Sequence, residues 1–330
     1  MEKVKRLSAF RKKNKSLISL KLLLLIISIL AFNSCTEREL FEGSVFPSIS
    51  GLYTEIFGEI SGKLTLNKSP YFISRDITVR RTDTLIIEPG VVLFFNEKSK
   101  LIVKGFLNAT GNRYRRIYFN AYKSEWSGIF FENSMKNSII KFCVLERMSS
   151  VQTVENINAS INIINSSATF QNNYFRNSNN SDGDFIFLQN SEITLTNNIF
   201  TSNKFGSNLI HSNNSNSKIF NNVFYNNKSL SNEDNIIIRN SVFNNIQNNI
   251  FYKNVSSNEI TSVDNDTSRF KIAFNFFGGD NNDPMFWNTE TFRLYYLSPC
   301  KDAGNPSPEF NDVDGSRNDQ GAYGGPFGNW

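Results

Sequence analysis

The side chains in this sequence that could carry out chemistry form two acidic clusters, Asp182 with Asp184 and Glu233 with Asp234. Each cluster precedes a short apolar stretch, and an uncharged Ser-Asn pair takes the corresponding place between them. Two carboxylates on nearby turns of a repeated structure could act as general acid and base in glycosidic cleavage, which needs a separation of about 5 to 10 Å. They could also hold Ca²⁺, or be ordinary solvated turn residues. Asp182, Asp184 and Asp234 are therefore the candidate catalytic residues.

The other reactive side chains do not add a second centre. His211, the only histidine, lies in an apolar stretch, where a partly buried strand residue is the expected role. One histidine and no cysteine cluster exclude a zinc site. Cys143 lies in an apolar strand and Cys300 in the terminal Ser-Pro-Cys element, at opposite ends of the elongated repeat structure predicted below, so we expect two buried thiols rather than a disulfide. Acidic residues around Gly315 indicate either a structural turn or a cation loop. We predict no cofactor, with Ca²⁺ as the one candidate ion.

These residues belong to a repeat. The segment Phe170–Phe175 recurs as Leu195–Phe200, Ile219–Phe224 and Ile246–Phe251, with the closing Phe residues 25, 24 and 27 positions apart. Short apolar stretches alternate with Asn, Ser, Asp and Gly, which favour turns, and no helical stripe is present. A helix-free repeat of roughly 25 residues is about one coil of a parallel β-helix. A disordered Asn-rich tract is the alternative, but disordered chains are poor in aromatic and β-branched residues.

The repeat predicts which residues form the scaffold. Equivalent positions in successive coils stack at the strand spacing of about 4.8 Å. We therefore expect the Phe residues to form a buried aromatic ladder and the Asn residues to form a hydrogen-bonded ladder at a turn. The predicted ladder residues are Asn172, Phe175, Asn197, Phe200, Asn221, Phe224, Asn248 and Phe251. Any function must then lie on the variable residues between the copies.

The N-terminus, residues 1–34, has the features of a signal peptide. Eight Lys and Arg residues precede the apolar run Leu22–Phe32, which is too short to span a bilayer comfortably and is typical of a signal h-region. The run is followed by Asn33-Ser34-Cys35, which resembles the lipobox of bacterial lipoproteins, in which the Cys becomes lipidated. We expect Cys35 to be the lipid attachment site. An ordinary signal peptide with an incidental Cys is the alternative.

The leader also accounts for the basic charge of the chain. It carries a net charge of +7, whereas the whole chain carries +5, so the remainder carries about −2. A basic surface for nucleic acid is therefore not expected. The partners we expect are a membrane, reached through the lipid anchor, and a polysaccharide or a surface protein.

Several stretches resemble the opening coils of right-handed parallel β-helix proteins of the pectin-lyase-like superfamily. They are Ile86–Phe94, Leu101–Gly105, Ile117–Phe119 and Trp126–Phe130. The far end, with Ser298–Gly304, Asp312–Gly315 and Asp319–Tyr323, resembles the ending of secreted members. The superfamily includes lyases, hydrolases and non-enzymes, so the resemblance implies the fold and leaves the activity open. The Asp, His and Arg cluster of its glycoside hydrolases is not found.

We therefore predict an all-β chain, a single-stranded right-handed parallel β-helix (solenoid) of roughly eight or nine coils. Its expected parts are a lipoprotein signal peptide (1–34), a tether and N-terminal cap (35–69), the β-helix (70–287) and a C-terminal capping segment (288–330). Trp126, Trp287 and Trp330 could offer stacking faces for sugars, although Trp126 takes a packed position of the family pattern.

The function that these features favour is a non-catalytic lipoprotein of the bacterial cell envelope, with an Asn- and Ser-rich surface that binds polysaccharide or protein. The outer membrane or the cell surface is the expected location. Repeat solenoids offer extended surfaces of this kind. The alternative is a polysaccharide lyase or glycoside hydrolase that uses the acidic candidates. A third candidate is an adhesive stalk that binds no glycan.

Overall fold

The computed structural model describes residues 53–330 except 135, 153–156, 241–242 and 264–269. The predicted signal peptide, Cys35 and the first part of the predicted tether lie outside the described residues. Within the described ranges, no helix combines the length and the apolar composition needed to cross a membrane.

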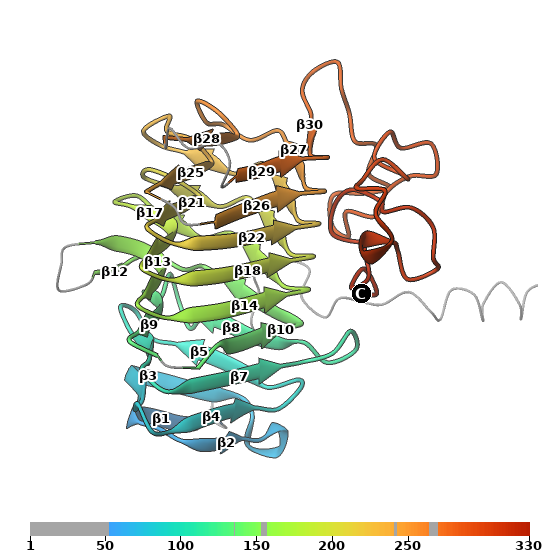
Figure 1. Ribbon diagram of the computed structural model, residues 1–330. Coiled ribbons are helices and arrows are strands. Elements are labelled where there is room, and N and C mark those ends of the chain that lie inside the picture. Colours follow the sequence, from blue (N-terminus) through green and yellow to red (C-terminus); the bar gives the residue numbers. More distant parts are fainter. Residues whose placement is uncertain (1–52, 135, 153–156, 241–242, 264–269) are drawn as a thin grey trace, which may run out of the picture. The chain divides into compact units, whose positions relative to one another are not determined.

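The strands stack as a parallel β-solenoid of about 8 turns, as the repeat predicted (Figure 1). Each coil of the central region runs through three walls and a short fourth strand. The first wall consists of β6 (Lys100–Val103), β9 (Gly128–Glu132), β13 (Asn158–Ile164), β17 (Asp184–Gln189), β21 (Ile210–Asn213), β25 (Ile236–Arg239) and β28 (Ile260–Ser262).

The second wall is a separate nine-stranded sheet. It consists of β2 (Gly62–Leu64), β4 (Thr84–Ile87), β7 (Phe106–Thr110), β10 (Ser138–Lys141), β14 (Ser167–Gln171), β18 (Glu192–Thr196), β22 (Asn216–Phe220), β26 (Phe243–Gln247) and β29 (Phe270–Ala273).

The third wall closes the coil. It consists of β5 (Val92–Phe95), β8 (Ile117–Ala121), β11 (Cys143–Glu146), β15 (Tyr174–Arg176), β19 (Ile199–Thr201), β23 (Val223–Tyr225), β27 (Ile250–Tyr252) and β30 (Phe276–Phe277). The longer strands β1 (Thr54–Glu59) and β3 (Tyr71–Val79) span the first and third walls.

Smaller elements complete the chain. A short sheet joins β16 (Asn179–Asn180), β20 (Lys204–Phe205) and β24 (Lys228–Ser229), and β12 (Val151–Gln152) pairs with β13 in the antiparallel direction. Two 3₁₀ helices cover Leu66–Lys68 and Pro308–Phe310.

An aromatic stack fills the interior of the middle coils. Phe175, Phe200, Phe224 and Phe251 are fully buried. Their neighbouring ring centroids are 4.5, 5.0 and 4.7 Å apart, and the ring planes differ by 7°, 19° and 14°. This spacing matches the strand spacing of about 4.8 Å, so each ring covers the next along the axis.

The corners of the coil are formed by residues in the left-handed backbone region. Asparagine adopts this conformation more readily than most residues because its short polar side chain hydrogen-bonds locally. The corner residues, with φ between 47° and 60°, are Asn165, Asn190, Asn214 and Asn240 between the first and second walls, Asn172, Asn197, Asn221 and Asn248 between the second and third, and Asn177, Ser202, Asn226 and Lys253 after the third.

The buried asparagine ladder uses the second Asn of each pair, not the predicted first one. The side-chain oxygen of Asn198 accepts the backbone N–H of Asn173 at 3.0 Å, and Asn222 accepts that of Asn198 at 2.9 Å. Asn249 and Asn275 continue the ladder at 2.8 and 3.0 Å. The predicted residues Asn172, Asn197, Asn221 and Asn248 point outward, because a left-handed corner residue turns its side chain away from the interior.

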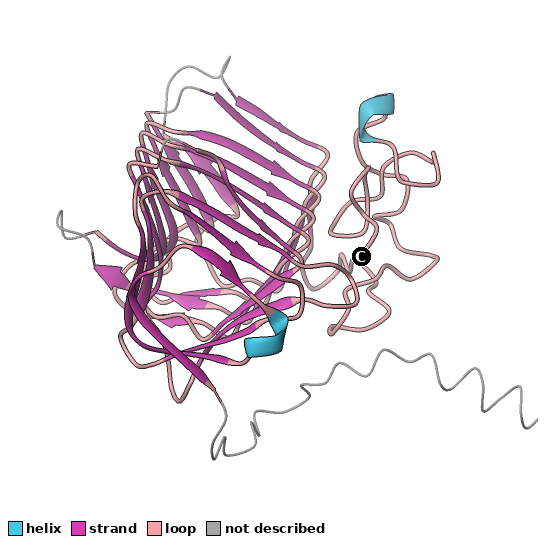
Figure 2. Ribbon diagram, turned by 90° about the horizontal axis from the view of Figure 1, so that it is seen from below, coloured by secondary structure: helices cyan, strands magenta, loops and turns pink. Residues whose placement is uncertain are grey.

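These outward asparagines hold the C-terminal segment against the side of the solenoid. Asn197 donates to the carbonyl oxygens of Ala322 and Gly324, at 2.9 and 2.7 Å, and Asn221 donates to that of Asp319 at 2.9 Å. Asn221 and Asn248 also bond to each other, at 3.4 Å. In Figures 1 and 2 the segment lies beside the coils.

A second apolar cluster lies between the segment and the outer face of the third wall. The residues from the wall include Tyr174, Ile199, Val223 and Ile250, and those from the segment include Phe292, Cys300, Ala322 and Trp330. Residues 288–330, which we expected to cap the end of the coil, therefore cover its flank. The cause is that the third wall presents apolar side chains outward as well as inward.

Candidate functional site: a polar groove along one corner

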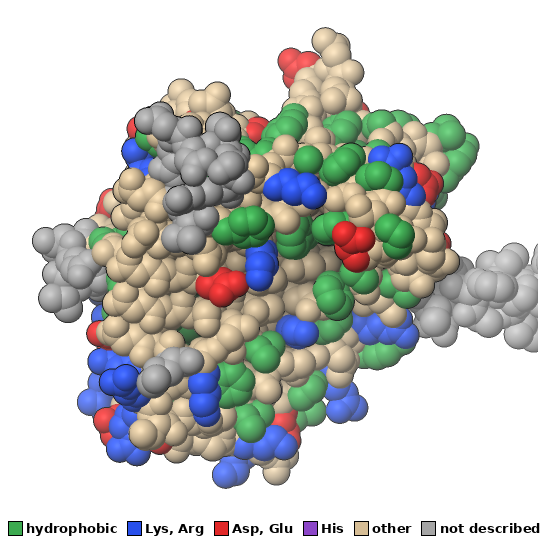
Figure 3. All heavy atoms as spheres, viewed as in Figure 1, with side chains coloured by type: hydrophobic (Ala, Val, Ile, Leu, Met, Phe, Trp, Pro, Cys, Tyr) green, Lys and Arg blue, Asp and Glu red, His purple; other side chains and the backbone are tan. Residues whose placement is uncertain are grey.

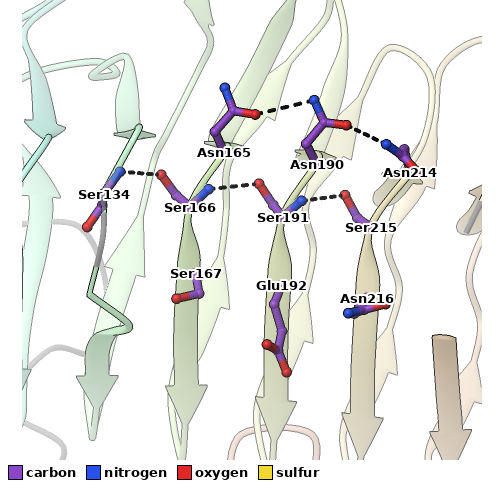
Figure 4. A pocket seen from close by; sticks show the side chains of 10 residues that line it. All are labelled: Ser134, Asn165, Ser166, Ser167, Asn190, Ser191, Glu192, Asn214, Ser215 and Asn216. Carbon is purple, nitrogen blue, oxygen red and sulfur yellow. Dashed lines mark hydrogen bonds between the residues drawn. The ribbon is translucent and has the colours of Figure 1, made fainter. Parts of the chain in front are cut away.

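A groove of about 440 Å³ lies along the corner between the first and second walls. It runs across successive coils, and all its lining residues are polar (Figure 4). They are Ser134, Asn165, Ser166, Ser167, Asn190, Ser191, Glu192, Asn214, Ser215 and Asn216.

One edge of the groove is a row of exposed amides. The side-chain nitrogen of Asn190 donates to the oxygen of Asn165 at 3.3 Å, and Asn214 donates to Asn190 at 2.6 Å. Asn165 in turn donates to Asn133 at 3.0 Å. Asn165 and Asn190 each use one donor and one acceptor within the row, and Asn214 uses one donor. The remaining hydrogen-bonding capacity of these amides faces outside the row.

The floor is a row of serines that fixes the spacing of the coils. The hydroxyl oxygen of Ser166 accepts the backbone N–H of Ser134 at 2.9 Å, and those of Ser191 and Ser215 repeat the contact at 3.1 and 3.0 Å. These serines are buried. The groove therefore has a rigid base, and its exposed amides are held at one step per coil.

The other edge is the start of three strands of the second wall. Ser167, Glu192 and Asn216 lie in register, one coil apart, and Phe243 follows in the same row with 45% of its surface exposed. The carboxylate of Glu192 lies 3.2 Å from the amine of Lys218. Few charged side chains appear over β14, β18 and β22 in Figure 3. The groove thus offers amides, hydroxyls and one neutralised carboxylate.

The predicted acids lie in a different place, at the start of first-wall strands, and serve structural hydrogen bonds there. Asp184 is 7% exposed and accepts the backbone N–H of Asn208 at 2.9 Å. The side chain of Asn208 donates to the backbone carbonyl of Asp234 at 2.8 Å, so Asn208 links the two acidic residues. Asp182 is exposed and bonds to the hydroxyl of Ser181.

Asp234 is also committed to neighbouring groups. It accepts hydrogen bonds from Ser257 and Asn258. Burial opposes its ionisation, but those bonds and one from Thr261 outweigh it and hold the pKa of Asp234 below the ordinary value. A lowered pKa favours a permanently ionised structural acceptor over a proton donor at neutral pH.

The structure brings Asp184 together with His211, a pairing that the sequence reasoning missed. The Nδ1 atom of His211 lies 2.9 Å from a carboxylate oxygen of Asp184, and the ring stands edge-to-face on Phe187 at 5.0 Å. The two residues are 27 positions apart, about one repeat, which is the signal that could have indicated the contact. Among the described residues, no group of three His, Cys, Asp or Glu side chains is placed to hold a metal ion.

The two cysteines are buried in the protein, and the acidic loop around Gly315 is held by backbone hydrogen bonds. Cys143 and Cys300 are both buried and unbridged. Burial raises the pKa of the Cys143 thiol and raises the pKa of Cys300 to about 12. The Asp312 carboxylate accepts backbone N–H groups from Asp319 and Gly325, and burial raises the pKa of Asp312 to about 6.

Comparison with protein-family models, with curated proteins and with solved structures finds no match for this chain.

Proposed function

We propose that this chain is a non-catalytic binding protein whose ligand is a polysaccharide lying along the polar groove, parallel to the solenoid axis. The observation that carries the proposal is the repetition of the same exposed group once per coil, at Asn165, Asn190 and Asn214. A row of evenly spaced amides suits a ligand that also repeats its hydrogen-bonding groups, as a sugar polymer repeats its hydroxyls.

The preorganisation of the groove supports this proposal. The amides are fixed by their own hydrogen-bonded row and by the serine floor, so little side-chain entropy is lost when a ligand binds. A site that spans several coils also lets weak contacts add along one polymer chain. The open shape of the groove suits a polymer that enters from the side rather than a small molecule that must be enclosed.

The surroundings of the acidic residues favour binding over cleavage. Asp184 and Asp234 are nearly buried and hydrogen-bonded, and Asn208 links them. A second candidate function, glycan cleavage, is favoured by one observation, the contact of Asp184 with His211, because such a pair can move a proton.

We further propose that the protein is a lipoprotein of the bacterial cell envelope, anchored through Cys35, with a pectin-lyase-like β-helix. The support is the leader sequence and the coil motifs around Ile86–Phe94. A Cys35→Ala protein should be released in soluble form. If that variant still partitions into detergent and is processed normally, Cys35 is not the anchor.

The test of the proposed function is a binding screen of the mature chain, made soluble by Cys35→Ala, against plant, algal and host polysaccharides with and without Ca²⁺. Binding should weaken at least tenfold in the triple variant Asn165→Gly, Asn190→Gly, Asn214→Gly. Glycine keeps the left-handed corners without strain, so the amides alone are removed. The matched control is Asn226→Gly, an exposed corner outside the groove.

Two results would overturn the proposal. One is equal binding by the triple variant and the control. The other is release of reducing or unsaturated sugar ends that is lost in Asp184→Asn, because that result would establish cleavage.

A further inference from the structure

A cluster of exposed aromatic side chains between β30 and the C-terminus, in residues 287–296, is not explained by packing. Trp287 is 70% exposed and Tyr296 is 69% exposed. The ring of Trp287 lies against that of Tyr295, with centroids 5.7 Å apart and planes at 28°, and Tyr296 lies 4.5 Å from Tyr295. The other tryptophans, Trp126 and Trp330, are buried. We call Trp287, Tyr295 and Tyr296 the aromatic platform.

A short hairpin holds the platform rigidly. The backbone N–H of Trp287 donates to the carbonyl of Arg293 at 2.7 Å, and that of Tyr295 donates to Met285 at 2.8 Å. Phe286 and Leu294 form an antiparallel bridge between these bonds. Trp287 and Tyr295 are therefore attached to paired backbone, and Tyr296 packs on Tyr295.

The opposite side of the hairpin is anchored in the apolar cluster on the third wall. Phe286 and Phe292 pack against Tyr225, with centroids 6.4 and 5.2 Å away. The guanidinium of Arg293 lies 4.4 Å from the ring centre of Tyr323. Because Phe286 and Leu294 face the solenoid, the alternation of side chains along the hairpin turns Trp287 outward.

The arrangement of the rings indicates the shape of the ligand. An aromatic cage for a cation surrounds its ligand with ring faces. Here Tyr295 contacts both Trp287 and Tyr296, and the two outer residues stay largely exposed. Such a surface suits a flat ligand with weakly polarised C–H groups, which pack against the negative face of an aromatic ring. The face of a pyranose sugar has this character, and its hydroxyls stay at the edge.

The charge around the platform narrows the ligand class further. Residues 280–330 contain eight Asp and Glu but three Lys and Arg. An anionic polysaccharide or an anionic membrane surface would be repelled by this segment. An uncharged polysaccharide would not be repelled by this segment.

We infer that the aromatic platform is a second carbohydrate contact, on which uncharged sugar rings stack over Trp287. This inference rests on the proposed function, polysaccharide binding, and narrows its ligand to neutral polymers. It involves residues remote in sequence from the groove, so the two sites can be tested separately.

The test uses the soluble mature chain and three sets of probes. The first set is neutral polysaccharides (laminarin, dextran and galactomannan), the second is anionic polygalacturonate, and the third is spermine together with anionic phosphatidylglycerol vesicles. Affinity is measured by calorimetry, and tryptophan emission is recorded at the same time. Since Trp287 is the exposed tryptophan, a stacked sugar should shift the emission to shorter wavelength.

We expect a neutral polysaccharide to bind with this shift, Trp287→Ala to weaken binding at least tenfold and abolish the shift, and Trp287→Phe to keep part of the affinity. The matched control is Tyr114→Ala, which removes another exposed ring (74%) from the β7–β8 loop and should bind normally. Unchanged binding by Trp287→Ala, or a preference for spermine, vesicles or polygalacturonate, would overturn the inference. If Trp287→Ala loses polysaccharide binding while the triple groove variant binds normally, the platform is the binding site and the proposed role of the groove is refuted.

Discussion

At the scale of single residues, asparagine has two different roles at adjacent positions of each coil. In Asn197-Asn198, the first residue takes the left-handed corner and bonds outward to Ala322 and Gly324. The second turns inward and joins the buried ladder. The sequence predicted the Asn pair and its turn, but the two roles depend on the sign of φ at one position, which the letters alone do not show.

The buried ladder predicts a strong effect of a single amide. In Asn198→Ala, the buried backbone N–H of Asn173 would lose the side-chain oxygen that it donates to, and the carbonyl of Phe170 would lose the side-chain amide that donates to it. An unsatisfied buried polar group costs about 1–3 kcal/mol, so we expect a loss of about 2–4 kcal/mol in the free energy of unfolding, measured with urea. Asn226→Gly should stay within about 0.5 kcal/mol of the parent. A loss below 1 kcal/mol for Asn198→Ala would show that the ladder is not a stabilising feature.

The two thiols predict chemical inertness. Burial raises the pKa of Cys300 to about 12 and also raises the pKa of Cys143, and the thiolate is the reactive form. In Cys35→Ala protein at pH 8, a disulfide reagent should react with neither thiol until denaturant is added, after which both should react. Rapid reaction of the native protein would contradict the buried placement.

At the scale of elements, the regular Phe positions led correctly to the coil. A period of about 25 residues ending in Phe indicated one ring per turn, and the observed stack of Phe175, Phe200, Phe224 and Phe251 has that arrangement. The short fourth strand and the division of roles at the corners were not predicted, because strands of two residues leave no periodic signal.

The stack predicts which core substitution is most damaging. Phe200 lies between Phe175 and Phe224 and also meets Phe185. Phe200→Ala should lower the free energy of unfolding by about 3–5 kcal/mol because it opens a cavity between two coils. Phe200→Leu should cost clearly less. Equal, small losses in the two variants would mean that the rings do not support one another.

The C-terminal segment predicts a specific pH dependence. The folded protein raises the pKa of Asp312 to about 6 from an ordinary value near 4. The stabilisation that the protonated Asp312 carboxyl contributes is therefore fully present below about pH 4, and it is lost as the pH rises through about 6. Between pH 4.5 and pH 7, the parent protein should lose stability relative to Asp312→Asn, measured as the difference between their urea midpoints. If the parent protein instead gained stability relative to Asp312→Asn as the pH rose, the predicted effect of Asp312 would be wrong.

At the scale of the whole molecule, the flank contacts could not be predicted from the repeat. Asn221 meets Asp319 across 98 residues of chain, and nothing in either local sequence specifies the other. The sequence did predict a C-terminal segment, residues 288–330, that does not continue the coils. Whether such a segment covers the end or the side depends on which outer face of the coil is apolar, and here it is the third wall.

The functional surroundings of the groove and of the acidic residues also depend on contacts between coils, which the sequence does not specify. The acidic clusters are catalytic candidates because carboxylates can transfer protons, but their partners Asn208, His211 and Ser257 come from other coils and are set by the three-dimensional structure. The groove residues Asn190 and Asn214 looked like ordinary turn residues, because their importance lies in stacking across coils.

The most direct test of polysaccharide binding in the groove is a crystal structure of residues 36–330 with a bound oligosaccharide of the polymer that gives the highest affinity. We expect a sugar chain parallel to the solenoid axis, with hydroxyls bonded to Asn165, Asn190 and Asn214 at one contact per coil. A sugar bound beside Asp184 and His211, with the groove empty, would contradict it.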